Sequence, residues 1–211
     1  MKLFAHCCRF GLCNSYILGT EESDSSKIPA AKQAVIIDPG GIDEHIIKII
    51  EENEYTLVGV LLTHGHLNHV KGIATLKRIY TTEIYCIRPA IREYKTIPVR
   101  DGEILRIGSF KIEVITAPGH SADSAVFKTD NLLFTGDALS AGLVGSTASI
   151  YGAANQISAL RNKILSMPGH YTILPGHGPP TSLEAERRFN AGVNSYKDYK
   201  SRRPNFRLEL D

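Results

Sequence analysis

Three histidines and one carboxamide lie close together near the first third of the chain. His64, His66, Asn68 and His69 fall within six consecutive positions, directly after the apolar run 58–62 in which we expect a buried strand. Successive side chains of an extended chain alternate between faces, so His64 and His66 point the same way, and Gly65 between them adds no bulk. If a helix follows, Asn68 and His69 lie on its first turn and face the same cavity from another side. This spacing is typical of a metal site.

Three later segments repeat the same arrangement, in which an apolar run ends at a glycine turn with a histidine or an aspartate. These segments are 117–121 with His120, 134–137 with Asp137, and 174–178 with His177. Solvated loop histidines would explain the first cluster taken alone, because short motifs often match without a function. Four strand ends that each carry a metal-ligand type favour one shared metal centre.

The ordered set resembles the metallo-β-lactamase superfamily, whose signature is His-x-His-x-Asp-His followed by a distant histidine, a distant aspartate and a final histidine. The match runs from about residue 14 to about residue 190. Carried over position by position, the resemblance implies a first metal site of His64, His66 and His120. It implies a second site that includes His69 and His177, and it makes Asp137 the ligand that bridges both. The resemblance also implies that Asp38 supports the metal centre, although a turn aspartate bonded to nearby backbone amides is an equal interpretation.

The chain departs from that signature at Asn68, where the family usually has aspartate. A carboxamide is neutral, is a weaker ligand and is no base at physiological pH. The second site then keeps His69, His177, the shared Asp137 and at most the carbonyl oxygen of Asn68. We therefore predict one tightly bound metal and a second that is weak or absent, with Asn68 and Asp137 as the catalytic positions. Asn68 is also predicted to be an N-cap of the helix that begins there.

Within the superfamily the chain looks most like the short glyoxalase II-like hydrolases. The resemblance rests on segments 14–16, 38–40, 63–69, 118–121 and 175–181. It implies a metal-dependent hydrolase of a thioester or another small ester that acts through metal-activated water, as in a hydroxyacylglutathione hydrolase-like thioesterase. Zinc is the first expectation for the metal, and iron or manganese also suit imidazole and carboxylate ligands. Full-length glyoxalase II adds a helical C-terminal domain that helps to hold glutathione, whereas only 34 of the 211 residues follow His177. The prediction is therefore of thioester chemistry, and it leaves the glutathione specificity open.

Two alternatives follow from the substitution at Asn68. A mononuclear iron persulfide dioxygenase of the same superfamily uses two histidines and a carboxylate with open positions on iron, which agrees with a weakened second site. A metal-binding homologue with impaired catalysis is the other alternative. Restoring aspartate at position 68 would then be expected to create or to raise hydrolysis.

The surrounding elements are predicted from periodicity and turn signals. Strands are expected at 14–18, 33–37, 58–62, 84–87, 104–107, 110–115, 125–128, 132–134 and 171–174, and helices at 42–52, 70–80, 157–165 and 183–193. Two groups of strands, each with helices to cover its outer face, predict an α/β (α+β) fold, a four-layered αββα sandwich of two mixed sheets flanked by helices. The superfamily has this fold, and the ligand loops would meet at one edge of it.

Composition agrees with a single domain over residues 1–211 that ends in a basic tail, 195–211. The chain has 24 basic and 22 acidic residues, so no general attraction to nucleic acid or to a membrane surface is implied, and a small-molecule substrate is expected. No run approaches the ~20 apolar residues that a membrane span requires, and the first residues do not resemble a secretory signal, so the expected location is cytoplasmic. The four cysteines, Cys7, Cys8, Cys13 and Cys86, lack Cys-x-x-Cys spacing and are expected to be partly buried strand thiols.

Overall fold

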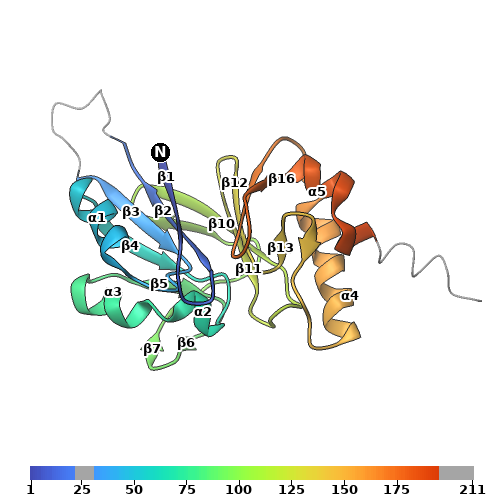
Figure 1. Cartoon of the computed structure of the whole chain (residues 1–211), viewed down its shortest axis with the longest axis horizontal. Helices are drawn as coiled ribbons and strands as arrows, with labels where there is room; N and C mark the ends of the chain where they lie inside the picture. Colours follow the sequence, from blue (N-terminus) through green and yellow to red (C-terminus); the bar gives the residue numbers. More distant parts are fainter. Residues whose placement is uncertain (22–30, 195–211) are drawn as a thin grey trace, which may run out of the picture.

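The computed structural model of the chain describes residues 1–21 and 31–194. In these residues two six-stranded sheets lie face to face, with helices on their outer sides (Figure 1). The first sheet has the order β1 (Lys2–Cys7), β2 (Asn14–Gly19), β3 (Gln33–Ile37), β4 (Thr56–Leu61), β5 (Ile84–Cys86) and β8 (Ile97–Pro98). The second has the order β16 (Thr181–Ser182), β15 (Thr172–Pro175), β12 (Leu132–Gly136), β11 (Ala125–Thr129), β10 (Phe110–Thr116) and β9 (Ile104–Ile107).

Both sheets are mixed. In the first sheet β3, β4, β5 and β8 pair in parallel while β1, β2 and β3 pair antiparallel. In the second sheet β12 and β15 pair in parallel and the other neighbours are antiparallel. Two short hairpins stand outside the sheets, β6 (Ala90–Ile91) with β7 (Tyr94–Lys95), and β13 (Leu139–Ser140) with β14 (Leu143–Val144).

The central strands are apolar on both faces because each face meets a different core. In β3, Ala34 and Ile36 pack toward the helices, whereas Val35 and Ile37 pack toward the other sheet. The side chains of a strand alternate, so a strand covered on both sides reads as a continuous apolar run. This is why the predicted strands at 33–37 and 58–62 lack an alternating polar pattern.

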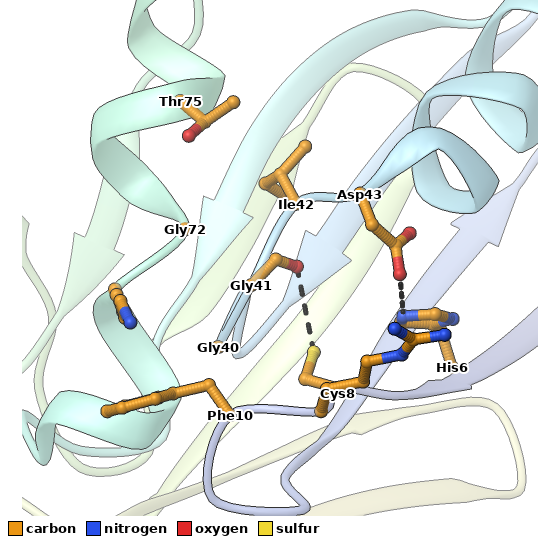
Figure 2. Close-up of a pocket in the computed structure, with 11 residues that line it drawn as sticks. His6, Cys8, Phe10, Gly40, Gly41, Ile42, Asp43, Gly72 and Thr75 are labelled. Carbon is orange, nitrogen blue, oxygen red and sulfur yellow. Dashed lines mark hydrogen bonds and ion pairs between the residues drawn. The ribbon is translucent and has the colours of Figure 1, made fainter.

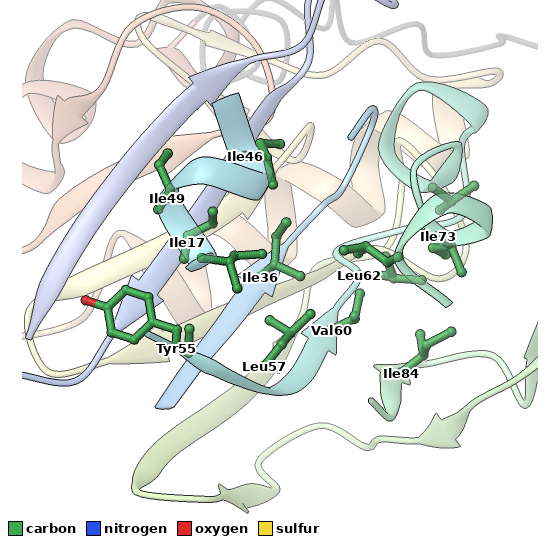
Figure 3. Packing of buried hydrophobic residues seen from close by; sticks show 14 of the residues in the cluster. Ile17, Ile36, Ile46, Ile49, Tyr55, Leu57, Val60, Leu62, Ile73 and Ile84 are labelled. Carbon is green, nitrogen blue, oxygen red and sulfur yellow. The ribbon is translucent and has the colours of Figure 1, made fainter. Parts of the chain in front are cut away.

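Three apolar layers separate the four structural layers. The first lies between the first sheet and helices α1 (Glu44–Glu52) and α3 (Ile73–Ile79), where Ile46, Ile49 and Ile73 contact the sheet (Figure 3). The second lies between the sheets. The third lies between the second sheet and helix α4 (Ile150–Ala159), the π-helix η1 (Leu160–Ile164) and α5 (Leu183–Phe189). The predicted αββα sandwich is therefore confirmed.

Three of the predicted helices differ from the observed ones. The helix expected at 183–193 ends as α5 at Phe189, because Asn190 is extended. The expected helix 70–80 is split into α2 (Leu67–Val70) and α3, because the chain passes close to Pro39 at Gly72, where a β-carbon would lie 2.5 Å from the Pro39 carbonyl oxygen. The expected helix 157–165 begins earlier, at Ile150, because the Ser149 hydroxyl accepts a hydrogen bond from the Gly152 amide and caps the helix. Strand β1 was not predicted, since it lies mostly exposed at the sheet edge and has no apolar run.

The helices of the described residues are all too short or too polar to cross a membrane. The cysteines of this part of the chain are free thiols, and Cys8, Cys13 and Cys86 are buried whereas Cys7 is exposed. The basic tail, 195–211, lies outside the described residues.

Candidate metal centre

The first predicted ligand group meets at one edge of the sandwich, beyond the ends of β4, β10 and β12. The Nδ1 atom of His66 lies 3.0 Å from the Nε2 atom of His64 and 3.0 Å from the Nε2 atom of His120. The Oδ2 atom of Asp137 lies 3.9 Å from His64 Nε2 and 3.5 Å from His120 Nε2. One ligand atom from each of the four residues lies within 4.8 Å of the others, which is close enough to share one metal ion.

A second group lies on the other side of Asp137. The Nε2 atom of His69 is 3.3 Å from Asp137 Oδ1, and the Nε2 atom of His177, which follows β15, is 3.5 Å from Asp137 Oδ2. These three residues also form a group that could hold a metal ion. Asp137 is common to both groups, which is the arrangement expected of a bridging carboxylate.

Two buried atoms of the second group lack hydrogen-bond partners. His69 Nε2 and Asp137 Oδ1 are both inaccessible to solvent, and apart from their 3.3 Å contact with each other they have no hydrogen-bond partner, although buried polar atoms in folded proteins are almost always satisfied. The other ring nitrogen of His69, Nδ1, contacts the Asp38 carboxylate at 2.9 Å, so Nε2 is the nitrogen left for a ligand bond. A cation between His69 and Asp137 satisfies both atoms. The donor set of imidazoles and a carboxylate suits zinc, iron or manganese, and the residues therefore fit a metal.

The charges of the site agree with that fit. Burial lowers the pKa of His69, but the negative charge of Asp38 and the contact with Asp137 raise it to about 12. Burial raises the pKa of Asp137, but the neighbouring histidines lower it to about 2, so this carboxyl stays ionised. Burial and the nearby His69 lower the pKa of His64 to about 3, which keeps that ring neutral with a free lone pair. Two carboxylates around His69 therefore require a positive charge, which a proton or a metal ion supplies.

Asp38 supports His69 from behind. It is 2% exposed and accepts hydrogen bonds from the Thr63 amide at 2.7 Å and from the Thr63 hydroxyl at 2.6 Å. Its Oδ2 atom faces His69, and a carboxylate in this position orients a ligating imidazole and raises its basicity. The supporting role implied by the resemblance thus agrees with the geometry. The buried Cys13 thiol also contacts this ring, 3.4 Å from His69 Nδ1, and burial raises the pKa of the thiol to about 11.

Backbone carbonyls orient two other rings. The Nδ1 atom of His120 lies 2.8 Å from the Ser146 carbonyl oxygen, and that of His177 lies 3.1 Å from the Leu12 carbonyl oxygen. A ring nitrogen that donates to a carbonyl fixes the tautomer, so the opposite Nε2 atom carries the lone pair. Neither carbonyl was predicted, because every residue has a backbone carbonyl and the residue type does not show which one accepts a hydrogen bond.

Two glycines allow the close packing around Asp137. A β-carbon at Gly176 would lie 2.4 Å from Asp137 Oδ1 and 2.6 Å from His69 Cε1. A β-carbon at Gly145 would lie 1.9 Å from the Asp137 carbonyl oxygen. Gly176 belongs to the predicted glycine turn before His177, whereas Gly145 carried no recognisable signal.

Asn68 lies beside His177 and does not cap a helix. The N-cap position of α2 is His66, without a side-chain cap, and Asn68 is the second residue of the helix, so the predicted cap is wrong. Its Nδ2 atom instead lies 2.9 Å from His177 Nε2. Since His177 Nδ1 donates to Leu12, Nε2 accepts from the Asn68 amide, and the lone pair that a second metal needs is engaged by Asn68.

A separate pocket of about 280 Å³ lies between the β1–β2 loop and the starts of α1 and α3 (Figure 2). His6 and Asp43 pair within it at 3.0 Å, and the Cys8 thiol faces the Gly41 carbonyl oxygen. Its wall at Gly40 touches Asn68, since a β-carbon there would lie 2.0 Å from the Asn68 carbonyl oxygen. None of the predicted metal ligands lines this pocket.

Comparison with known proteins agrees with this geometry. Residues 9–177 match the model of the Metallo-beta-lactamase superfamily. A hydroxyacylglutathione hydrolase from Idiomarina loihiensis is 34% identical over 134 residues, which are 63% of this chain and 49% of that protein. The chain thus spans about half the length of that relative.

Solved structures show the same fold. The BLEG-1 B3 metallo-beta-lactamase superposes with a TM-score of 0.77 at 25% identity, over 91% of this chain and 99% of its own. The protein TTHA1623, solved in a di-iron-bound form, superposes with a TM-score of 0.72 at 26% identity, over 89% of this chain and 98% of its own. The ordered ligand positions, the αββα sandwich and the match over most of the chain lead to one conclusion: this chain belongs to the metallo-beta-lactamase superfamily.

Proposed function

We propose that the chain is a metal-dependent hydrolase of thioesters or other small esters. The observation that carries the proposal is the pair of ligand groups around Asp137, in which the buried atoms His69 Nε2 and Asp137 Oδ1 contact each other and have no other partner. The likeness to a hydroxyacylglutathione hydrolase supports a thioester as the substrate. The near balance of 24 basic and 22 acidic residues supports a small-molecule substrate over nucleic acid.

We propose zinc as the first choice of metal, with iron and manganese as alternatives that suit the same ligands. The tighter site would comprise His64, His66, His120 and Asp137. The weaker site would comprise His69, His177 and Asp137, because Asn68 engages His177 and adds no charge. Metal ions held by these residues would lower the pKa of bound water to about 7 and polarise a carbonyl oxygen, which is the chemistry that ester hydrolysis needs.

Neither Asp137 nor Asn68 accepts a proton at neutral pH, and the other side chains orient the ligands. Asp137, with a pKa of about 2, stays ionised and serves as an anionic ligand. Asn68 offers an N–H donor or a carbonyl acceptor but has no basic form. Asp38 and Thr63 hold the His69 ring, and Ser146 holds His120, so the ligand atoms are already aligned before a substrate binds.

Metal content and thioester hydrolysis, measured on the same natively purified protein, test the proposal. Elemental analysis without added metal should give between one and two ions per chain. Hydrolysis of a panel of acyl thioesters, followed by thiol release, should disappear on treatment with a chelator and return with the metal. A fully metal-loaded protein that cleaves neither thioesters nor oxygen esters would contradict the proposal and favour a non-catalytic metal-binding homologue.

A mononuclear iron dioxygenase is the second candidate, and the hydrogen bond between Asn68 and His177 favours it. That bond reduces the ligands open to a second ion and leaves one complete site. One iron per chain together with oxygen consumption in the presence of a persulfide would support this candidate. Zinc without oxygen consumption would eliminate it.

A further inference from the structure

The rim of the metal centre carries a guanidinium group that the ligand set does not use. The segment 88–96, which follows β5, packs against Gly65, the residue between His64 and His66. The position that a β-carbon of Gly65 would occupy lies 3.3 Å from Arg88 Nη1, 3.2 Å from Ile91 Cδ1 and 3.1 Å from Asp123 Oδ2. A β-carbon at Gly65 would be tight against all three atoms, so the glycine leaves room for the Arg88 guanidinium beside the segment that carries His64 and His66.

The backbone of Arg88 is held while its side chain is exposed. The Arg88 carbonyl oxygen accepts hydrogen bonds from the Cys86 thiol and from the Thr96 hydroxyl, and these contacts anchor the segment at both ends. Ile91 is 3% exposed and fixes the segment against Gly65. The backbone of Arg88 is thus held in place while its guanidinium reaches the solvent, to which His66 is also exposed.

The charges near Arg88 are not paired with one another. Among the described residues, no hydrogen bond or ion pair involves the Arg88 guanidinium. Asp123, 7% exposed, accepts a hydrogen bond from the Ser121 hydroxyl at Oδ1, whereas its buried Oδ2 atom has no partner. In the described part of the chain no salt bridge joins this carboxylate to the Arg88 guanidinium, so the N–H donors of Arg88 stay available.

We propose that Arg88 is a specificity-determining residue that binds a carboxylate of the substrate. The preferred thioester then carries a carboxylate, on either its acyl part or its thiol part, while the thioester carbonyl faces the ligands of the first group. A guanidinium has five N–H donors in a planar fork and binds a carboxylate through two parallel hydrogen bonds. This inference rests on the proposed hydrolase function, and it adds the chemical class of the substrate.

Matched thioesters test the proposal on the metal-loaded protein. Succinyl and butyryl thioesters of N-acetylcysteamine differ by one carboxylate on the acyl part, and butyryl thioesters of N-acetylcysteamine and of 3-mercaptopropionate differ by one carboxylate on the thiol part. The natural chain should prefer one anionic member of these pairs, through a lower KM, by about tenfold or more, the usual value of a charge-assisted hydrogen bond. Arg88→Gln should remove that preference and leave the neutral butyryl thioester of N-acetylcysteamine unaffected. Lys95→Gln removes a charge from the exposed strand β7 of the same segment and should change nothing.

The outcomes separate this proposal from the proposed function. Hydrolysis with equal ratios in the natural chain and in Arg88→Gln would overturn the role of Arg88 and leave the hydrolase intact. If no thioester is cleaved, binding of butyrate and of neutral butyramide, measured by calorimetry on both proteins, decides the question. Tighter binding of butyrate that is lost in Arg88→Gln would keep the carboxylate site and reject the thioesterase. Equal binding of the acid and the amide by the natural chain would reject the carboxylate site as well.

Discussion

Replacing Asn68 by aspartate should strengthen the second metal site. The side-chain amide lies 2.9 Å from His177 Nε2 and contacts the loop at Gly11, where a β-carbon would lie 2.6 Å from Asn68 Cβ. Aspartate has nearly the same shape, so Asn68→Asp changes the charge with little change in packing. A carboxylate cannot donate to His177 Nε2, and the lone pair of that ring becomes available for a metal.

The size of the effect follows from opposing electrostatic contributions. Attraction between unit charges at ~4 Å is about 4 kcal/mol at an effective dielectric constant of ~20, and a divalent ion doubles it. Removal of a half-buried carboxylate from water costs several kcal/mol, and repulsion from Asp137 opposes the gain further. A net gain of about 1.4 to 2.8 kcal/mol remains, which corresponds to a second metal bound about ten to a hundred times more tightly.

Calorimetric titration of zinc into metal-free protein measures both sites, and elemental analysis after dialysis counts the retained ions. Asn68→Asp should retain close to two ions and should hydrolyse thioesters faster than the natural chain. Asn131→Asp, in the exposed turn at the opposite end of β12, is the matched control for the added charge and should match the natural chain. If the natural chain already holds two ions tightly and Asn68→Asp changes neither affinity nor rate, the weak second site is refuted.

Three further predictions concern the support of the centre. Gly176→Ala places a β-carbon 2.4 Å from Asp137 Oδ1, and it should abolish binding of the second ion in a metal titration, whereas Gly41→Ala, with its nearest contact at 3.8 Å, should not. Asp38→Asn removes the charge behind His69 and should weaken metal binding by about ten to a hundredfold, the usual effect of losing such a partner; unchanged affinity would show that the Cys13 side of the ring is sufficient. Glu186→Gln, at a buried carboxylate that accepts from the Gly142 amide, the Thr181 hydroxyl and the Asn190 amide, should lower the free energy of unfolding by about 1 to 3 kcal/mol in urea titrations without changing metal content. A loss of metal in Glu186→Gln would link the β13–β14 hairpin to the centre, contrary to this expectation.

The helix expected at 70–80 and the cap expected at Asn68 were predicted wrongly because tertiary contacts, which local sequence does not show, decide both. The periodic apolar residues of 70–80 predict one helix, but the contact of Gly72 with Pro39 interrupts it. The N-cap preference of Asn68 is a local tendency that is not realised, because the helix starts at Leu67 with His66 as its cap, two positions earlier than an Asn68 cap allows. Local preferences decide an element only where no packing contact competes with them.

Residue order by itself determined the fold class and the candidate ligands. Apolar runs predict central strands that are buried on both faces. Glycine turns end these runs, and the residues that follow the turns, His64, His120, Asp137 and His177, are therefore expected at one edge of the sandwich. Only the tertiary structure decided what holds and surrounds these ligands. The Ser146 and Leu12 carbonyls and the position of Arg88 beside Gly65 each join segments that are distant along the chain. Such contacts depend on how distant segments pack against each other. Every residue has a backbone carbonyl and every glycine lacks a β-carbon, so the sequence does not show which of them contact the site.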